Sequence, residues 1–511
     1  AFKKGDYFYF EGRKDDINDD YGHGSGVASL TSYYALNIAD GASNQGKLWI
    51  ASARILNEQN KLDEQLLSLV LEHVVDTFAP MGVKIFNLSV NVINRKWNEE
   101  KKRTIPRESW IARKIDKLSK EKDVVIVVST GNIGLLDVSN YYKKGIEYPK
   151  YLLDENSRIF DPAQAALALT VGSIASTTLV STGSDIVIAG KNYPSPFTRS
   201  GPGICKEIKP ELIEGGGNYV IDSAKAVKTN IGTSIITASN SISPPIIHNC
   251  GTSFSAARVS HKLGLILNDL KELGLGEISA PLLKAFLVNS AQYPLSPDDF
   301  TALISQLGID NINPCLNLVG YGVPDEIRAT FCDDYNVVTY YQGEIKPDSV
   351  AYFDIPVPAS LASAISGEKK LTITVVYHPE VQRWGLERYL GATLKWRMFR
   401  GDVSKTEVVK AMSIEDSDNA EESERPDQIK FIHGINLRSR GAIQHDMFIW
   451  SSHDEAFSAN HYTLAIASFK KWSSQPIKYG IVVRLEELSR SVPIYSEFQT
   501  RIGHIQVHAR V

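Results

Sequence analysis

Up to about residue 335, short and uniformly apolar stretches alternate with amphipathic stretches in which apolar residues recur every three or four positions. Residues 47–56, 83–90 and 124–130 have the apolar character of buried strands, whereas residues 62–78 and 109–123 have helical periodicity. Strands that are apolar on both faces are typical of parallel sheets covered by helices. This pattern predicts an α/β domain with a parallel sheet and helices on both of its faces.

After about residue 335 the pattern changes to short stretches rich in β-branched and aromatic residues, such as "KKLTITVVYHP" and "YTLAIASFKKW". Stretches of this kind, separated by polar breaks, predict an antiparallel β-sandwich. We therefore expect two domains, residues 1–335 and residues 336–511. Within the second, the acidic stretch 413–427 is expected to be a surface loop.

Composition excludes several classes of function. The formal net charge of −4 over 511 residues gives no basis for binding nucleic acid or an anionic membrane surface. The longest apolar runs, such as residues 124–128, are too short to span a membrane. The four cysteines have neither the spacing of a zinc site nor that of a disulfide framework, so we expect no metal, no cofactor and a cytoplasmic protein.

The stretch "NCGTSFSAARVSHKLGLILNDL" (249–270) places three small residues directly before a long apolar helix. One of them, Ser253, has two interpretations. A serine at a helix start is commonly an N-cap, whose oxygen accepts an unpaired backbone N–H. It is also well placed as a nucleophile, because the same N–H groups and the helix dipole favour the negative charge of an acyl-transfer intermediate.

Two further stretches favour the interpretation of Ser253 as a nucleophile over that of an N-cap. The predicted strand at 124–130 leads into Gly131 and Asn132, which either form a turn or aim an amide N–H at an oxyanion. His23 lies between glycines before a predicted helix, which suits either a structural histidine or a base. Together His23, Asn132 and Ser253 supply a base, an oxyanion donor and a nucleophile, the three parts of acyl-transfer catalysis.

These motifs resemble those of the subtilases, the subtilisin-like serine peptidases. "GHGSGVAS" is similar to their catalytic-histidine motif, "STGN" to their oxyanion motif and "CGTSFSAARVS" to their nucleophile motif. The resemblance covers about residues 1–335 and implies a subtilisin-like sheet and a serine endopeptidase. It implies that Ser253 is the nucleophile, His23 the general base and Asn132 the oxyanion donor.

The stretch "NLSV" (87–90) resembles the strand edge that pairs with substrate in this family. The resemblance therefore implies that Ser89, Val90 and Gly131 bind the substrate backbone. Some positions depart from the family pattern: Ser25 and Gly26 stand where threonine and histidine are usual, and Ala257 and Arg258 stand where proline and histidine are usual. The changes at Ala257 and Arg258 are expected to affect packing more than chemistry.

A narrower resemblance concerns "RIFDPAQAALALTVGSIA", "IKPELIEGGGN", "FLVNSAQYP" and "GYGVPDEIRATF". These stretches are similar to bacterial subtilases that are encoded beside an AAA-type ATPase and carry a β-rich C-terminal domain. The resemblance implies an ATPase partner and an intracellular role, such as defence against phage.

Subtilases also carry a triad aspartate, at the end of an apolar strand that precedes the histidine. No strand and no apolar run ending in Asp-x-Gly is expected before His23, and we expect Asp15, Asp16, Asp19 and Asp20 to lie in a solvated loop. The aspartate is therefore expected upstream of residue 1. On this interpretation the sheet lacks the strand that would carry it, and no buried carboxylate reaches the Nδ1 of His23. The alternative function is then a catalytically weak module that binds peptides or a partner.

Overall fold

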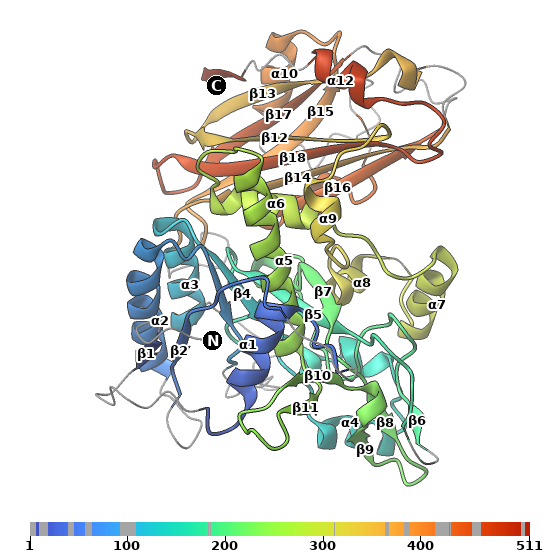
Figure 1. Ribbon diagram of the computed structural model, residues 1–511. Helices are drawn as coiled ribbons and strands as arrows, with labels where there is room; N and C mark the ends of the chain where they lie inside the picture. Colours follow the sequence, from blue (N-terminus) through green and yellow to red (C-terminus); the bar gives the residue numbers. More distant parts are fainter. Residues whose placement is uncertain are drawn as a thin grey trace. The chain divides into compact units, whose positions relative to one another are not determined.

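The computed structural model of the chain contains two compact units (Figure 1). One unit comprises residues 1–268 and 291–325, and the other comprises residues 269–290 and 326–511. A domain division at residue 335 remains a prediction. The structure describes residues 7–9, 19–38, 45–56, 64–91, 109–181, 183, 185–310, 312–362, 367–382, 389–413, 429, 431–451, 461–501 and 506–510.

The first unit is built on a parallel sheet of four strands in the order β3-β4-β5-β7. The strands are β3 (Ile85–Leu88), β4 (Val125–Ser129), β5 (Leu169–Ile174) and β7 (Leu212–Gly215). Every residue of β4 is buried, which explains why its sequence is apolar throughout instead of alternating. The predicted parallel sheet is confirmed, and β3 and β4 lie within the predicted stretches 83–90 and 124–130.

Two helices cover one face of this sheet, α2 (Glu64–Phe78) and α3 (Trp110–Glu121). Their apolar residues recur at helical spacing and therefore gather on one side of each helix. These side chains form one buried cluster with the strands, which includes Leu67, Leu71, Val75, Ile111, Ile115, Leu118, Ile126 and Val128. Both helices match the predicted helical stretches 62–78 and 109–123.

Other elements of this unit position the site. Helix α1 (His23–Tyr33) packs against the hairpin of β10 (Ile235–Ala238) and β11 (Ile246–Asn249), and α5 (Thr252–Glu272) follows that hairpin directly. Leu30, Ile235 and Phe254 form a small buried cluster that joins the three elements. The unit also contains α4 (Leu135–Lys143), α7 (Pro297–Leu307), α8 (Ile312–Val319), β6 (Ile186–Val187), β8 (Tyr219–Ile221) and β9 (Val227–Thr229).

The expectation that no strand precedes His23 is wrong. Strand β1 (Tyr7–Tyr9) pairs in parallel with β2 (Ser52–Arg54). The residues before His23 are mostly polar and charged, but the aromatic residues of the Tyr-Phe-Tyr stretch favour a strand. Residues 10–18 lie outside the described part of the chain, so the position of the triad aspartate stays a prediction.

The second unit contains two antiparallel sheets of four strands each, which confirms the predicted C-terminal β domain. One has the order β12-β18-β14-β16, with strands Asn336–Ile345, Ile477–Glu487, Lys369–His378 and Ile443–Trp450. The other has the order β15-β17-β13-β19, with strands Ala392–Arg400, His461–Lys470, Ser349–Pro356 and Gln506–Arg510. The helices of the second unit are α6 (Ala280–Asn289), α9 (Glu326–Thr330), α10 (Lys405–Met412), α11 (Ile435–Arg438) and α12 (Tyr495–Arg501).

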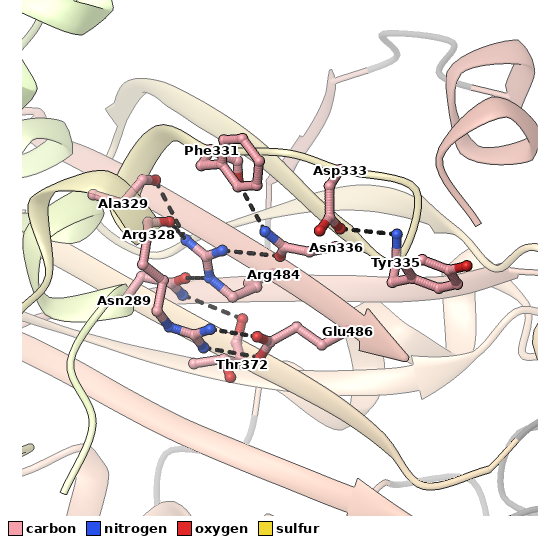
Figure 2. A network of polar contacts seen from close by, with 10 residues as sticks. All are labelled: Asn289, Arg328, Ala329, Phe331, Asp333, Tyr335, Asn336, Thr372, Arg484 and Glu486. Atoms are coloured by element: carbon pink, nitrogen blue, oxygen red, sulfur yellow. Dashed lines mark hydrogen bonds and ion pairs between the residues drawn. The ribbon is translucent and has the colours of Figure 1, made fainter. Parts of the chain in front are cut away.

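A buried arginine ties the helices of the second unit to its sheet (Figure 2). Arg484 of β18 is fully buried and donates to the side-chain oxygens of Asn289 (3.2 Å) and Asn336 (2.9 Å) and to the backbone oxygen of Arg328. Each of these acceptors is needed, because an unpaired buried guanidinium is strongly destabilising. Asn289 is the last residue of α6, so this network joins α6 to β18 within the unit.

A bidentate ion pair lies beside that arginine (Figure 2). Arg328 donates to both carboxylate oxygens of Glu486, one of them at 2.9 Å. Burial alone would raise the pKa of Glu486, but the hydrogen bonds and charge of Arg328, with the charges of Arg484 and Lys370, hold that pKa below its ordinary value.

Among the described residues, no helix is both long and apolar enough to cross a membrane.

Candidate active site

His23 is the first residue of α1, and its backbone is held by an acidic side chain. Gly22, at the N-cap position, has a φ of 75° and offers no side chain to the unpaired N–H groups of the first turn. Asp19 takes that role, because its carboxylate accepts from the N–H of Gly22 (2.9 Å) and from the N–H of Ser25 (2.6 Å). The expectation of a solvated loop is therefore wrong for Asp19.

The imidazole of His23 lies against helix α5. Its ring centroid is 5.9 Å from that of Phe254, the residue after Ser253. His23 is exposed, yet desolvation by the surrounding protein lowers its pKa below the ordinary value of 6.5, and the charge of Asp19 partly offsets this. A lowered pKa favours the neutral imidazole near pH 7, which is the form that a general base needs.

Ser253 is the second residue of α5 and is only 7% exposed. Its backbone oxygen accepts a hydrogen bond from the hydroxyl of Ser89, which follows β3 (3.3 Å). Within the described part of the chain, the structure contains no hydrogen bond between the Ser253 hydroxyl and the His23 ring. Such bonds are often long in unliganded enzymes and tighten only when substrate is bound.

Asn132 follows β4, and its amide has a defined orientation. Its Oδ1 accepts from the backbone N–H of Thr252 (2.9 Å) and from the hydroxyl of the same residue (3.1 Å). A backbone N–H is only a donor, so the atom facing it must be the oxygen, and Nδ2 must point the other way. A Cβ atom on Gly251 would lie 3.2 Å from Nδ2, so the free donor lies beside the start of the nucleophile helix.

An arginine that was not predicted from the sequence, Arg199, supports the turn before Asn132. Arg199 donates from Nε to the backbone oxygen of Asn132 (3.1 Å), and its guanidinium carbon lies 3.5 Å from the ring centroid of Phe160. Burial lowers the pKa of Arg199 to about 10, so it still carries its charge at neutral pH. No sequence signal distinguishes Arg199 from a surface residue.

Gly131 is required by this packing, which gives a first prediction. It has a φ of 89°, and a Cβ there would lie 2.8 Å from a ring carbon of Phe160. Gly131→Ala is expected to lower the free energy of unfolding by about 2–4 kcal/mol, because backbone strain and a clash add together. Gly82→Ala is the matched control, since Gly82 has a φ of 92° but nothing within 4 Å of its Cβ position. Denaturant unfolding of both variants measures the difference, and equal losses would contradict this account of Gly131.

The two other candidate substrate-binding residues differ in their surroundings. The hydroxyl of Ser89 accepts from the side-chain nitrogen of Asn87 (3.0 Å) while it donates to Ser253, so it joins β3 to α5. Val90 instead packs against the apolar cluster that contains α2 and α3. The structure thus brings His23, Ser89, Asn132 and Ser253 to the start of α5, and substrate binding by Ser89, Val90 and Gly131 stays a prediction.

The departures from the family pattern are explained by packing. A Cβ on Gly26 would lie 3.1 Å from Phe254 and 3.2 Å from the Thr237 hydroxyl, so a larger residue there would separate α1 from its neighbours. Arg258 donates to the backbone oxygens of Tyr34 and Gly215, both at 3.1 Å. Its side chain therefore joins α5 to the ends of α1 and β7.

Neighbouring groups add no second chemistry to the site. Burial raises the pKa of Cys250, whose sulfur lies 3.4 Å from the backbone oxygen of Asn218, so this thiol is a poor nucleophile. The described residues include no group of three or more histidine, cysteine or acidic side chains that could hold a metal ion. The basic sequence of residues 95–107 suggests either a rim of the substrate cleft or, more simply, a solvated insertion, and this stretch lies outside the described residues.

Comparison with known proteins gives one extensive family match. The profile of the Subtilase family, Peptidase S8, matches residues 4–322. The uncharacterized protein y4bN of Sinorhizobium fredii (strain NBRC 101917 / NGR234) is 28% identical over 439 residues, which cover 82% of this chain and 96% of that protein.

Similarity to solved structures is weaker. The prenylagaramide maturation protease PagA is 19% identical and aligns over 60% of this chain and 80% of that chain, with a TM-score of 0.35. A lanthipeptide protease is 16% identical and aligns over 61% of this chain and 75% of that chain, with a TM-score of 0.37. Similarities of this size carry no information about substrate.

Proposed function

Because the chain belongs to the subtilase family of serine peptidases, we propose that it hydrolyses peptide bonds with Ser253 as nucleophile and His23 as general base. The observation that carries this proposal is the orientation of Asn132, whose amide oxygen is held by Thr252 while its N–H group lies beside Gly251, two residues before Ser253. A defined donor next to a serine at a helix start is the arrangement needed to stabilise an oxyanion.

The proposed reaction has two stages. The Ser253 oxygen bonds to the scissile carbonyl carbon while its proton passes to His23, and Asn132 and the Ser253 backbone N–H donate to the oxyanion. His23 then gives the proton to the leaving amine as the C–N bond breaks, which leaves an acyl-enzyme. Water, deprotonated by His23, releases the acid and regenerates the serine.

Active-site labelling tests this assignment. A fluorophosphonate forms a bond from phosphorus to the serine oxygen and releases fluoride, so it reports the nucleophile without knowledge of the substrate. Peptide mapping is expected to place the adduct on Ser253. A label on another residue, or no label, would contradict the assignment.

One observation favours the second candidate function, a peptide-binding module with weak catalysis. Among the described residues, no hydrogen bond fixes the His23 ring, although the acidic partner of a triad histidine normally holds its tautomer. The same experiment separates the two functions, since a weak catalyst would label slowly while still binding peptide.

We also propose an ATPase partner and a cytoplasmic location, with the C-terminal β domain recruiting the partner or the substrate. The support is the resemblance of the sequence to ATPase-linked subtilases and the free thiols of Cys250, Cys315 and Cys332. With the full-length chain and the ATPase encoded beside it, the labelling rate of Ser253 is expected to change at least about tenfold with ATP, as coupling energies between sites allow. A rate that is independent of both ATPase and ATP would contradict the partnership, and with it a role in phage defence controlled by that ATPase.

A further inference from the structure

The residue that holds the start of α1 also bears on the chemistry of His23. The carboxylate of Asp19 accepts from three backbone N–H groups, those of Tyr21 (3.3 Å), Gly22 (2.9 Å) and Ser25 (2.6 Å), and His23 and Gly24 lie between the last two. A Cβ on Gly24 would lie only 3.3 Å from a carboxylate oxygen of Asp19, so the turn closes tightly around this side chain. The backbone position of His23 is therefore fixed by Asp19.

Asp19 is itself held from a distant part of the chain. Asn240, in the loop between β10 and β11, donates from Nδ2 to the backbone oxygen of Asp19 at 2.6 Å. Its Oδ1 would lie 3.2 Å from a Cβ on Gly22, so the same side chain also limits the turn before His23. The β10–β11 hairpin, which leads into α5, thus holds the loop that precedes His23.

The charges around His23 leave Asp19 in a distinct role. Helix α5 places the uncharged ring of Phe254 with its centroid 5.9 Å from that of the imidazole, and the β10–β11 loop contacts Asp19 through the neutral side chain of Asn240. The neighbouring Asp20 is turned to Arg54 of β2, with which it forms an ion pair of 2.7 Å. Of the described titratable groups, Asp19 is the one whose charge acts on His23.

We propose that Asp19 is a positioning residue for His23, which fixes the first turn of α1 and stabilises the imidazolium formed during reaction. This role rests on the proposed function of His23 as general base. The negative charge requires no hydrogen bond to the ring, because a carboxylate bonded to N–H groups on either side of His23 lies near enough for its charge to favour the protonated form. Asp19 would thereby act on the proton affinity of His23 without occupying the place of the triad aspartate.

The pH dependence of fluorophosphonate labelling tests the proposal. The rate constant should rise with pH as His23 loses its proton, with a midpoint below 6.5 in the wild-type chain. In Asp19→Asn the midpoint is expected to move lower by roughly half a pH unit or more, because removing a negative charge disfavours imidazolium. The plateau rate is expected to fall as well, since the turn loses part of its anchor. Asp20→Asn, which removes the adjacent carboxylate, should leave midpoint and plateau unchanged.

Two further measurements separate the possible failures. If Ser253 is not labelled in the wild-type chain, the proposed function fails, and an NMR titration of the His23 ring still compares its pKa between wild type and Asp19→Asn. A purely structural Asp19 would lower the plateau and leave the midpoint in place, which would overturn the proposal. Asp19→Ser retains one acceptor for the N–H groups and replaces Asp19→Asn if that variant does not fold; its midpoint should also move lower.

Discussion

Replacement of Ser253 by alanine is expected to remove fluorophosphonate labelling and to lower kcat on a peptide substrate by about 10⁶. That magnitude was measured in a subtilisin, a member of the same family. The loss is this large because the side chain forms the covalent bond, so no other group at the start of α5 can replace it. The nearby thiol of Cys250 cannot replace the serine, because burial raises its pKa and keeps it protonated.

The matched control is Ser260→Ala, in the same helix. The Ser260 hydroxyl donates to the backbone oxygen of Ala256 (2.9 Å), one turn earlier, and lies 3.3 Å from the side-chain oxygen of Asn87, so its loss removes no hydrogen bond to Ser253, His23 or Asn132. Labelling and kcat are expected to stay near the wild-type values, with thermal melting as a check on the fold of both variants. Equal labelling of Ser253→Ala and wild type would refute the assignment of Ser253 as the nucleophile.

The second large effect is expected for Asn132→Asp. A carboxylate still accepts the hydrogen bonds of Thr252, but it provides no N–H for the oxyanion and adds a negative charge beside it. Loss of one such donor typically lowers kcat by about 10²–10³, a range that includes a measurement in a subtilisin, with little change in KM.

Asn132→Ala separates the donor from the acceptor. It loses both functions of the amide, so its melting temperature should fall below that of Asn132→Asp, while both variants lose kcat. Steady-state kinetics and thermal melting together measure the two effects. An Asn132→Asp enzyme with unchanged kcat would show that this amide does not stabilise the oxyanion.

The fold was predictable where burial leaves a clear periodicity. Strand β4 is apolar throughout because every residue in it is buried, and α2 and α3 show one apolar face because one face packs on the sheet. Strand β1 was not predicted, because a strand of three residues is too short to show a period and its pairing with β2 depends on the backbone. Aromatic content was the signal that could have identified it.

The site was predictable only for residues with a local motif. His23, Asn132 and Ser253 each stand at the junction of a loop and an element, and small residues mark those junctions in the sequence. Arg199 and Asn240 reach the site from 67 and 221 residues away, counted to their partners Asn132 and Asp19, so no local pattern reveals them. Asp19 did have a signal, because an aspartate three residues before a glycine at a helix start often binds the free N–H groups of the first turn.

Helix α6 is synthesised well before β18, the strand that its last residue contacts. All ten of its residues are buried, and Asn289 at its end holds Arg484 of β18, nearly at the far end of the chain. The ribosome therefore releases an apolar helix long before the strands that will cover it exist. A nascent chain of this protein is expected to need a chaperone between the synthesis of α6 and that of β18, and a stop codon before β18 would leave this helix without the strand that covers it.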